Sequence, residues 1–166
     1  MRRPRLSHLD ARDRPAMVDV GGKEVTARTA EAEARVSLPP AVARALRVSG
    51  HRTRKGPVFD TAILAGVMAA KRAHELIPFC HPLPLENCQI EIAQRRGSVI
   101  VVRCSVSVHH RTGVEMEALT GAAVAALTIY DMCKALSHDI EIGGLRLIRK
   151  AGGRRPFARR RVRRVA

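Results

Sequence analysis

The sequence has few aromatic residues: no tryptophan, one tyrosine and three phenylalanines in 166 positions. A hydrophobic core must therefore be built mainly from aliphatic side chains. Apolar residues nevertheless make up 46% of the chain, which is too many for a disordered protein. The length fits one domain, and we expect it to cover residues 1–153, with a flexible start of about 16 residues.

Long hydrophobic runs and closely spaced cysteine pairs are also absent. The most apolar stretch, residues 118–130, is too short to cross a bilayer, and the N-terminal arginines are not followed by an apolar segment. Cys80, Cys88, Cys104 and Cys133 lie 8, 16 and 29 residues apart, which matches neither a disulfide scaffold nor a zinc site. We therefore expect a cytoplasmic protein with reduced thiols, no metal site and no membrane partner.

Acidic residues are missing from both ends of the chain, and this determines the net charge of +15. Residues 1–5 contain three arginines, residues 149–166 contain nine basic residues, and the rest of the chain carries only +3. We expect the arginine-rich tail, residues 154–166, to be disordered. It could bind nucleic acid by charge, although Phe157 is its only aromatic side chain. A basic nucleic-acid-binding module is therefore the alternative to an enzyme.

Hydrophobic periodicity predicts helices and strands in a mixed order. Helices are expected over 41–48, from Asp60 or Thr61 to about 76, and over 114–136, and strands over 31–38, 89–93, 98–109 and 140–148. A basic glycine-bracketed loop, 49–57, and a stiff proline-rich loop, 77–84, connect some of these elements. The order mixes hairpins with crossovers and favours an α+β layer over a doubly wound sheet.

Asp131 and Lys134 lie near the end of the longest predicted helix. A carboxylate there faces the negative end of the helix dipole, which is unfavourable by a few tenths to about 1 kcal/mol, so Asp131 needs a cationic partner. Lys134, three residues later, can provide it, and such a pair suits proton transfer. Spacing alone favours a purely structural ion pair over this catalytic interpretation.

Glu115 and Glu117 lie at the other end of the same helix. A capping box that begins at Thr112 explains Glu115 fully, whereas Glu117 has no such explanation. Glu117 and Asp131 are 14 residues apart, which corresponds to about 21 Å along a helix. A single small-molecule site that uses both ends must therefore be completed by a neighbouring subunit or hold a long ligand. Small residues between the ends favour close packing of another helix or subunit.

Other candidate residues lie in loops. His81 is held in an extended backbone by the next proline, and it could position a phosphate or only satisfy local backbone groups. Cys80 is a weak candidate for a nucleophile, because no helix N-terminus adjoins it. Lys55, Lys23 and Arg28 could bind a polyphosphate, although isolated charges of this kind are more often solvated. No Walker-type motif is present, which excludes a P-loop NTPase.

Several long strings together resemble the molybdenum cofactor biosynthesis protein C family. They occur in the family's order at residues 17–20, 55–56, 69–72, 76–83, 112–120 (TGVEMEALT) and 123–135 (AVAALTIYDMCKA). The resemblance extends over residues 7–153. One departure is Arg154-Arg155-Pro156 after Gly152-Gly153, where family members commonly continue with Lys-Ser-Gly.

The resemblance implies a ferredoxin-like α+β subunit, with an antiparallel sheet and helices packed on one face. It implies a homohexamer, a trimer of dimers, with active sites between subunits. Members of the family are lyases that convert the GTP-derived (8S)-3′,8-cyclo-7,8-dihydroguanosine 5′-triphosphate to cyclic pyranopterin monophosphate and diphosphate. They need no cofactor, although Mg²⁺ could accompany the triphosphate.

The resemblance also assigns roles to single residues. Asp131 and Lys134 match the family's acid/base pair, and Lys55 and His81 are further active-site positions. Cys80 and Met116 match positions that line the substrate, and Lys23 and Arg28 match positions of triphosphate contact. The positions that match the family's substrate-binding residues are Cys80, His81, Glu115, Met116, Glu117, Lys23 and Arg28.

Overall fold

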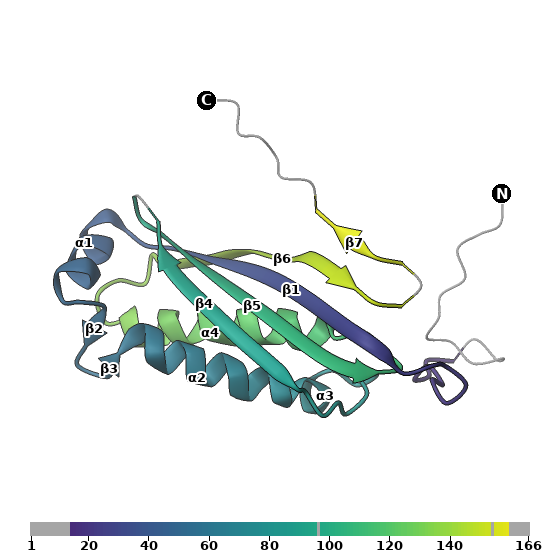
Figure 1. The fold of residues 1–166 in the computed structure, drawn as a ribbon. Coiled ribbons are helices and arrows are strands. Elements are labelled where there is room, and N and C mark those ends of the chain that lie inside the picture. The colour runs from purple at the N-terminus through teal and green to yellow at the C-terminus, as the bar shows by residue number, and fades with distance from the viewer. Residues whose placement is uncertain (1–13, 96, 154, 160–166) are drawn as a thin grey trace.

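The computed structural model describes residues 14–95, 97–153 and 155–159, which form a layer of sheet and a layer of helices (Figure 1). The sheet has five antiparallel strands in the order β4-β5-β1-β6-β7. Their bounds are β1 Thr26–Ser37, β4 Asn87–Gln94, β5 Val99–His110, β6 Glu141–Ala151 and β7 Phe157–Ala158. A separate hairpin consists of β2 Arg52–Thr53 and β3 Gly56–Pro57. The expected α+β arrangement is confirmed.

Two long helices, α2 Val58–Lys71 and α4 Glu115–Cys133, cover one face of this sheet (Figure 1). The short helices are α1 Pro40–Val48, at one end of the sheet, and α3 Ala73–Leu76, directly after α2. Glycines allow α2 and α4 to approach closely, since a Cβ atom on Gly66 would lie 2.8 Å from the carbonyl oxygen of Gly121. The small residues of α4 therefore pack against α2 within the same chain.

Alternation of residues along β1 explains which of its faces is buried. Ala30, Ala32, Ala34 and Val36 point into the core beneath the helices and are at most 3% exposed. The predicted strand over 31–38 is confirmed, and it starts five residues earlier, at Thr26. The hairpin predicted over 89–109 is also confirmed, as β4 and β5.

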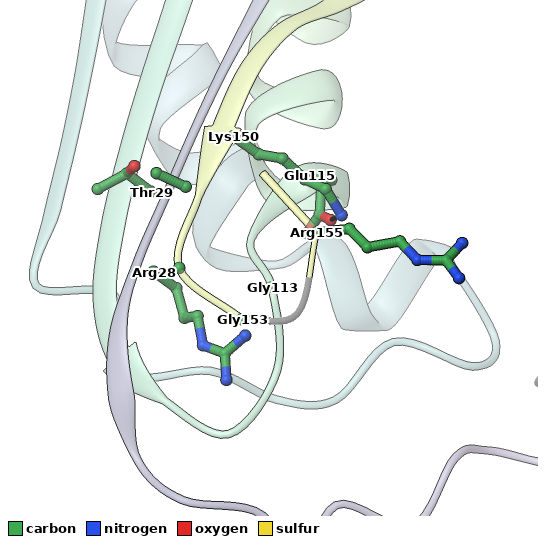
Figure 2. A pocket seen from close by; sticks show the side chains of 9 residues that line it. Arg28, Thr29, Gly113, Glu115, Lys150, Gly153 and Arg155 are labelled. Carbon is green, nitrogen blue, oxygen red and sulfur yellow. Dashed lines mark hydrogen bonds and ion pairs between the residues drawn. The ribbon is translucent and has the colours of Figure 1, made fainter. Parts of the chain in front are cut away.

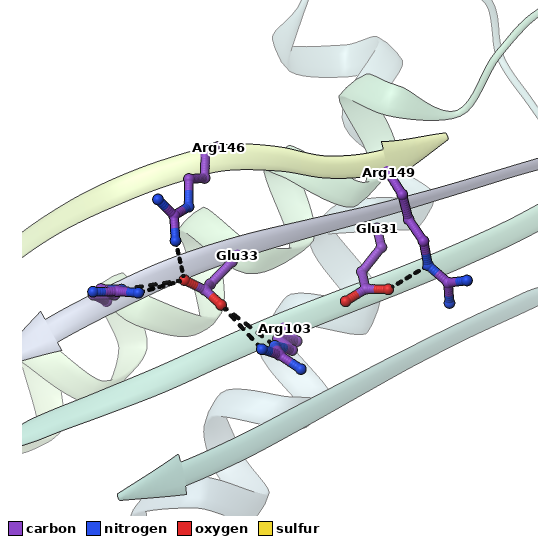
Figure 3. A network of polar contacts seen from close by, with 6 residues as sticks. Glu31, Glu33, Arg103, Arg146 and Arg149 are labelled. Atoms are coloured by element: carbon purple, nitrogen blue, oxygen red, sulfur yellow. Dashed lines mark hydrogen bonds and ion pairs between the residues drawn. The ribbon is translucent and has the colours of Figure 1, made fainter. Parts of the chain in front are cut away.

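The described helices leave the opposite face of the sheet open, and Glu33 of β1 is buried there among arginines (Figure 3). Its carboxylate accepts hydrogen bonds from Arg35 at 3.1 Å, Arg146 at 2.9 Å and Arg103 at 3.4 Å. Burial raises the pKa of Glu33, but the hydrogen bonds from Arg35 and Arg146 outweigh burial and hold the pKa below its ordinary value. This network connects β1, β5 and β6.

The prediction that Asp60 or Thr61 caps the second helix is wrong. The helix α2 begins at Val58 after Pro57, and no side chain caps it. Thr61 lies inside the first turn, where its hydroxyl donates to the carbonyl of Pro57 at 2.6 Å. The fixed backbone of a proline suits a helix start without a polar cap. The helix also ends at Lys71, and the residues up to Leu76 form the separate helix α3.

The predicted capping box before α4 is also wrong. The N-cap position is Val114, which makes no side-chain cap, and Thr112 lies before it. The Glu115 carboxylate instead accepts a hydrogen bond from Lys150 of β6 at 2.5 Å. The contact with Lys150 of a distant strand therefore replaces the local cap.

The arginine-rich tail is only partly covered by the described residues. Residue 154 and residues 160–166 lie outside them, as do residues 1–13, where a flexible start was predicted. Phe157 and Ala158 form β7, which pairs with Lys150 and Arg149 of β6. The prediction of disorder is therefore wrong for this part of the tail. Among the helices that the structure describes, none has the length and hydropathy of a membrane span.

Candidate active site

A carboxylate between two lysines marks the C-terminal end of α4. Asp131 accepts from the amines of Lys55 at 2.7 Å and Lys134 at 2.9 Å. These two hydrogen bonds lower the pKa of Asp131 to about 2, and the bond with Asp131 raises the pKa of Lys134. The amine of Lys55 also donates to the backbone carbonyl of Asp131 at 2.9 Å. The predicted pair of Asp131 and Lys134 is therefore a triad of charges at the surface.

The β2–β3 hairpin brings Lys55 to the end of α4, and the corner before the hairpin is held from several sides. His51 adopts a left-handed backbone with φ of 60°. Its ring stacks on Phe59 with centroids 4.2 Å apart, and its Nε2 atom donates to the side-chain oxygen of Gln94 at 3.1 Å. Gly56, with φ of 116°, supplies the turn after Lys55. This corner fixes the position from which Lys55 extends.

A cavity of about 530 Å³ lies beside this triad, between α1, the hairpin and the end of α4. Its apolar wall includes Leu46, Met132 and Leu136, and Arg52, Arg54 and Lys55 contribute its cationic side. The cavity is thus accessible from the same side of the molecule as Lys55.

A second cavity, of about 410 Å³, lies at the start of α4. His81 is fixed in it, because its Nε2 atom donates to the carbonyl of Val18 at 2.9 Å. The segment around Val18, which precedes β1, and the proline-rich loop therefore meet at this site. The predicted residues that line the cavity are Lys23, Cys80, His81, Glu115, Met116 and Glu117.

Glu117 is a buried carboxyl group in this second cavity. It is 5% exposed, and no ion pair joins it to any residue that the structure describes. Burial raises its pKa to about 7, and the negative charge of Glu115 adds to the rise. Burial and the charge of Glu117 also raise the pKa of Cys80. Cys80 is therefore a weak nucleophile, while Glu117 can exchange a proton near neutral pH.

Arg28 lies beside this cavity, in a smaller one of about 80 Å³ that it shares with Glu115 and Lys150 (Figure 2). The guanidinium of Arg28 donates to the backbone carbonyls of His110 at 3.1 Å and Arg111 at 3.5 Å. The Gly152-Gly153 turn packs against Ala27 and Arg28, so closely that a Cβ atom at Gly152 would lie 2.0 Å from the backbone oxygen of Ala27 and 3.0 Å from the Cδ atom of Arg28. Arg28 is therefore held rigidly.

Sequence reasoning missed Lys150 as a site residue. It was grouped with the basic tail, whereas it belongs to β6 and reaches Glu115 at the start of α4. The only signal in the sequence was its place two residues before Gly152-Gly153, near the end of the range that resembles the family. Arg155, which also lines the small cavity, is another residue that the motifs did not select.

The structure does not bring the two groups of predicted residues together. Lys55, Asp131 and Lys134 lie at the C-terminal end of α4, and the remaining predicted residues lie at its N-terminal end. The two ends are about 21 Å apart along the helix axis. Within the described residues, no cluster of three or more histidine, cysteine, aspartate or glutamate side chains could hold a metal ion.

Comparison of the chain with known proteins identifies one family. The model of the MoaC family matches residues 17–153. A cyclic pyranopterin monophosphate synthase from Xanthomonas oryzae is 60% identical over 154 residues, which cover 93% of this chain and 93% of that protein. A molybdenum cofactor biosynthesis bifunctional protein from Synechocystis is 47% identical over 153 residues, or 90% of this chain and 44% of that protein. The matched range includes both ends of α4, and the chain therefore belongs to the MoaC family.

Proposed function

We propose that the chain is a cyclic pyranopterin monophosphate synthase of molybdenum cofactor biosynthesis. It converts (8S)-3′,8-cyclo-7,8-dihydroguanosine 5′-triphosphate to cyclic pyranopterin monophosphate and diphosphate. Membership of the MoaC family supports this activity, and the Xanthomonas relatives are named for it. The observation that carries the proposal is the Asp131 carboxylate between Lys55 and Lys134. The nucleic-acid-binding alternative gains no support from the comparisons.

The charges of the triad suggest a division of labour in proton transfer. Asp131, with a pKa of about 2, is ionised at neutral pH and is a poor base there. Lys134 holds its proton, because its pKa is raised by Asp131. We therefore assign the proton-donating role to the lysines and an orienting role to Asp131. A lysine that has given its proton to a substrate nitrogen is a neutral amine, which can accept a proton in the following step.

The cations at the start of α4 suit the triphosphate. Formation of the cyclic phosphate requires a sugar hydroxyl to attack the α-phosphorus while diphosphate leaves. Lys23 and Arg28 would stabilise the charge that develops on the phosphate oxygens, and the fixed guanidinium of Arg28 needs little reorganisation to do so. Mg²⁺ would enter with the triphosphate as part of the substrate, and the proposal includes no cofactor bound to the protein.

The separation of the two groups supports an active site shared between two subunits. One small substrate does not reach both ends of α4 in a single chain, because they are about 21 Å apart. Two copies related by a two-fold axis, with their α4 helices antiparallel, would place the start of one helix beside the end of the other. Each pair of subunits would then hold two complete sites.

The surface between the two ends suits contact with a second copy. Residues 118–130 of α4 and residues 61–70 of α2 contain no charged residue. Large apolar side chains are nevertheless exposed there, with Leu64 66% and Leu127 56% exposed. An uncharged face with exposed leucines is typical of a protein interface.

The same arrangement would also give the buried Glu117 a cationic neighbour. Glu117 has no ion-pair partner among the described residues, whereas the other end has two lysines for the single carboxylate of Asp131. Antiparallel pairing would bring the excess lysine charge toward the unpaired glutamate. We extend this dimer to the hexamer that the family resemblance implies, a trimer of such dimers. The four free cysteines suit a reducing cytoplasm, where we place the protein.

The direct test is incubation of the purified full-length chain with the cyclic dihydro-GTP, followed by separate measurement of diphosphate and the pyranopterin product. We expect both products in equal amounts. Asp131→Asn and Lys134→Ala should each lower the rate by about 10²–10⁴-fold. Glu91→Gln, which changes an exposed carboxylate of β4, is the matched control and should retain the wild-type rate. Absence of product would refute the function, and near-normal rates in both site variants would refute only the roles.

A further inference from the structure

Two cysteines outside the candidate active site lie close together. The Sγ atoms of Cys88 on β4 and Cys104 on β5 are 4.0 Å apart. In the strand register Cys88 pairs with Val106 and Cys104 pairs with Ile90, so the two cysteines are diagonal neighbours. Both belong to the core side of the sheet, which the helices cover.

The two thiols differ in access and in acidity. Cys88 is partly exposed on β4, whereas Cys104 is fully buried. Among the residues that the structure describes, β4 is hydrogen-bonded to a neighbouring strand on one side only. The hydrogen bond from the Cys104 thiol lowers the pKa of Cys88 in spite of burial, and the nearby charge of Lys71 contributes. The same contact and burial raise the pKa of Cys104. Burial also raises the pKa values of Cys80 and Cys133.

We propose that Cys88 and Cys104 form a peroxide-sensitive thiol pair that closes to a disulfide between β4 and β5. Cys88 is the group that reacts with the oxidant, because a thiolate is the reactive form and Cys88 is accessible. Cys104 is the resolving thiol, since it lies beside Cys88 and is shielded from solvent. This modification site is independent of the proposed function.

The reaction balances with a hydroperoxide as the only oxidant. The Cys88 thiolate attacks one peroxide oxygen, the O–O bond breaks, and with hydrogen peroxide the second oxygen leaves as hydroxide. Cys88 is then a sulfenic acid. The Cys104 sulfur displaces the sulfenic hydroxyl, which leaves as water with the Cys104 proton. In sum, two thiols and one hydrogen peroxide give one disulfide and two water molecules, and the two sulfurs lose two electrons to the peroxide.

The packing around the pair indicates which side moves. Closure shortens the distance between the sulfurs from 4.0 Å to about 2 Å. Gly121 of α4 lies against Cys104, so that a Cβ atom there would be 2.7 Å from its sulfur. Cys104 is therefore confined, and the approach is made by Cys88 on the edge strand β4, which no further strand restrains among the described residues.

The test uses the wild-type protein and hydrogen peroxide. After treatment, remaining free thiols are alkylated and the protein is digested without reductant for mass spectrometry. We expect a linked peptide containing Cys88 and Cys104 that is two hydrogens lighter than the separate peptides and that disappears on reduction. Cys80 and Cys133 should still be alkylated at the peroxide dose that links the pair.

Matched variants separate the two roles. In Cys104→Ser, Cys88 should stop at the sulfenic acid and be trapped by a cyclic 1,3-diketone. In Cys88→Ser, Cys104 should stay reduced at the same dose. Cys104→Ala and circular dichroism are the controls for a folding defect that a buried serine would cause in Cys104→Ser. Oxidation of Cys80 before Cys88, or absence of the linked peptide in the wild-type protein, would overturn the proposal.

Discussion

Restoration of activity by two inactive variants is the sharpest prediction of a shared active site. His81→Ala removes a residue at the start of α4, and Lys134→Ala removes one at its end. If each site combines the start of one α4 with the end of the partner's α4, a dimer with one copy of each variant has one site with both defects and one site with neither. The mixed dimer should therefore be active although each parent is inactive.

The expected recovery follows from the two-fold arrangement. When both variants are co-expressed in equal amounts and pair at random, each half of a site is intact with a probability of about one half, so about a quarter of the sites are complete. The mixture should therefore show about a quarter of the wild-type rate of diphosphate release. The assay is turnover of the cyclic dihydro-GTP by the whole mixture, in which both variants carry the same affinity tag so that purification does not select mixed dimers.

Pairs of variants from the same end provide the control. His81→Ala with Glu117→Gln should show no recovery, because the part of the site at the start of α4 is then defective in every site. A site contained within one chain would give no recovery in the mixed-end pair either. Wild-type levels of activity in the isolated variants would contradict the roles of these residues instead.

Three further predictions concern the fold and the tail. Glu33→Gln should lower the free energy of unfolding at pH 7 by about 2–4 kcal/mol, as measured by denaturant titration, because it removes a buried charge from its arginines. The pKa of Glu33 is lower in the folded state, so the contribution of its charge is present above the unfolded pKa of about 4.3, and the deficit should become smaller as pH falls below that value. Gly66→Ala should lower stability by about 1–3 kcal/mol in the same titration, since its Cβ atom would meet the backbone of Gly121, whereas Gly22→Ala, where a Cβ meets no atom within 4 Å, should not. Truncation after Arg159 keeps β7 and should leave turnover of the cyclic dihydro-GTP unchanged, and a large loss of rate would assign the tail a part in catalysis.

Local patterns predicted most of the fold, and long-range partners explain where they failed. The alternation in β1 was sufficient to identify a strand, because one face contacts the core and the other contacts polar side chains. The capping box failed, because Lys150 of β6 takes up the Glu115 carboxylate that the motif assigned to the helix start. A capping-box motif compares residues three positions apart, so it cannot show a contact with a distant strand.

In the candidate site, too, local patterns predict some contacts and miss those that depend on tertiary packing. The pair of Asp131 and Lys134 follows from helix geometry, since residues three apart share a face. Lys55 lies 76 residues earlier in the chain and reaches Asp131 only because the hairpin folds over the end of α4. No periodicity predicts that contact, and the family resemblance implied only that Lys55 is an active-site position. Burial of Glu117 without an ion-pair partner likewise depends on tertiary packing.

The two ends of α4 each contain a carboxylate in an unfavourable place. Asp131 lies at the negative end of the helix dipole, and Glu117 is buried, which raises its pKa to about 7. A helix selected only for stability would have a lysine or an apolar residue at either position. The first group is stabilised by two lysines of its own chain, and the second has no such partner among the described residues. Because α4 offers an uncharged face between them, two antiparallel copies can bring these unequal ends together, and the uncompensated group then lies where a substrate and the partner's lysines can reach it.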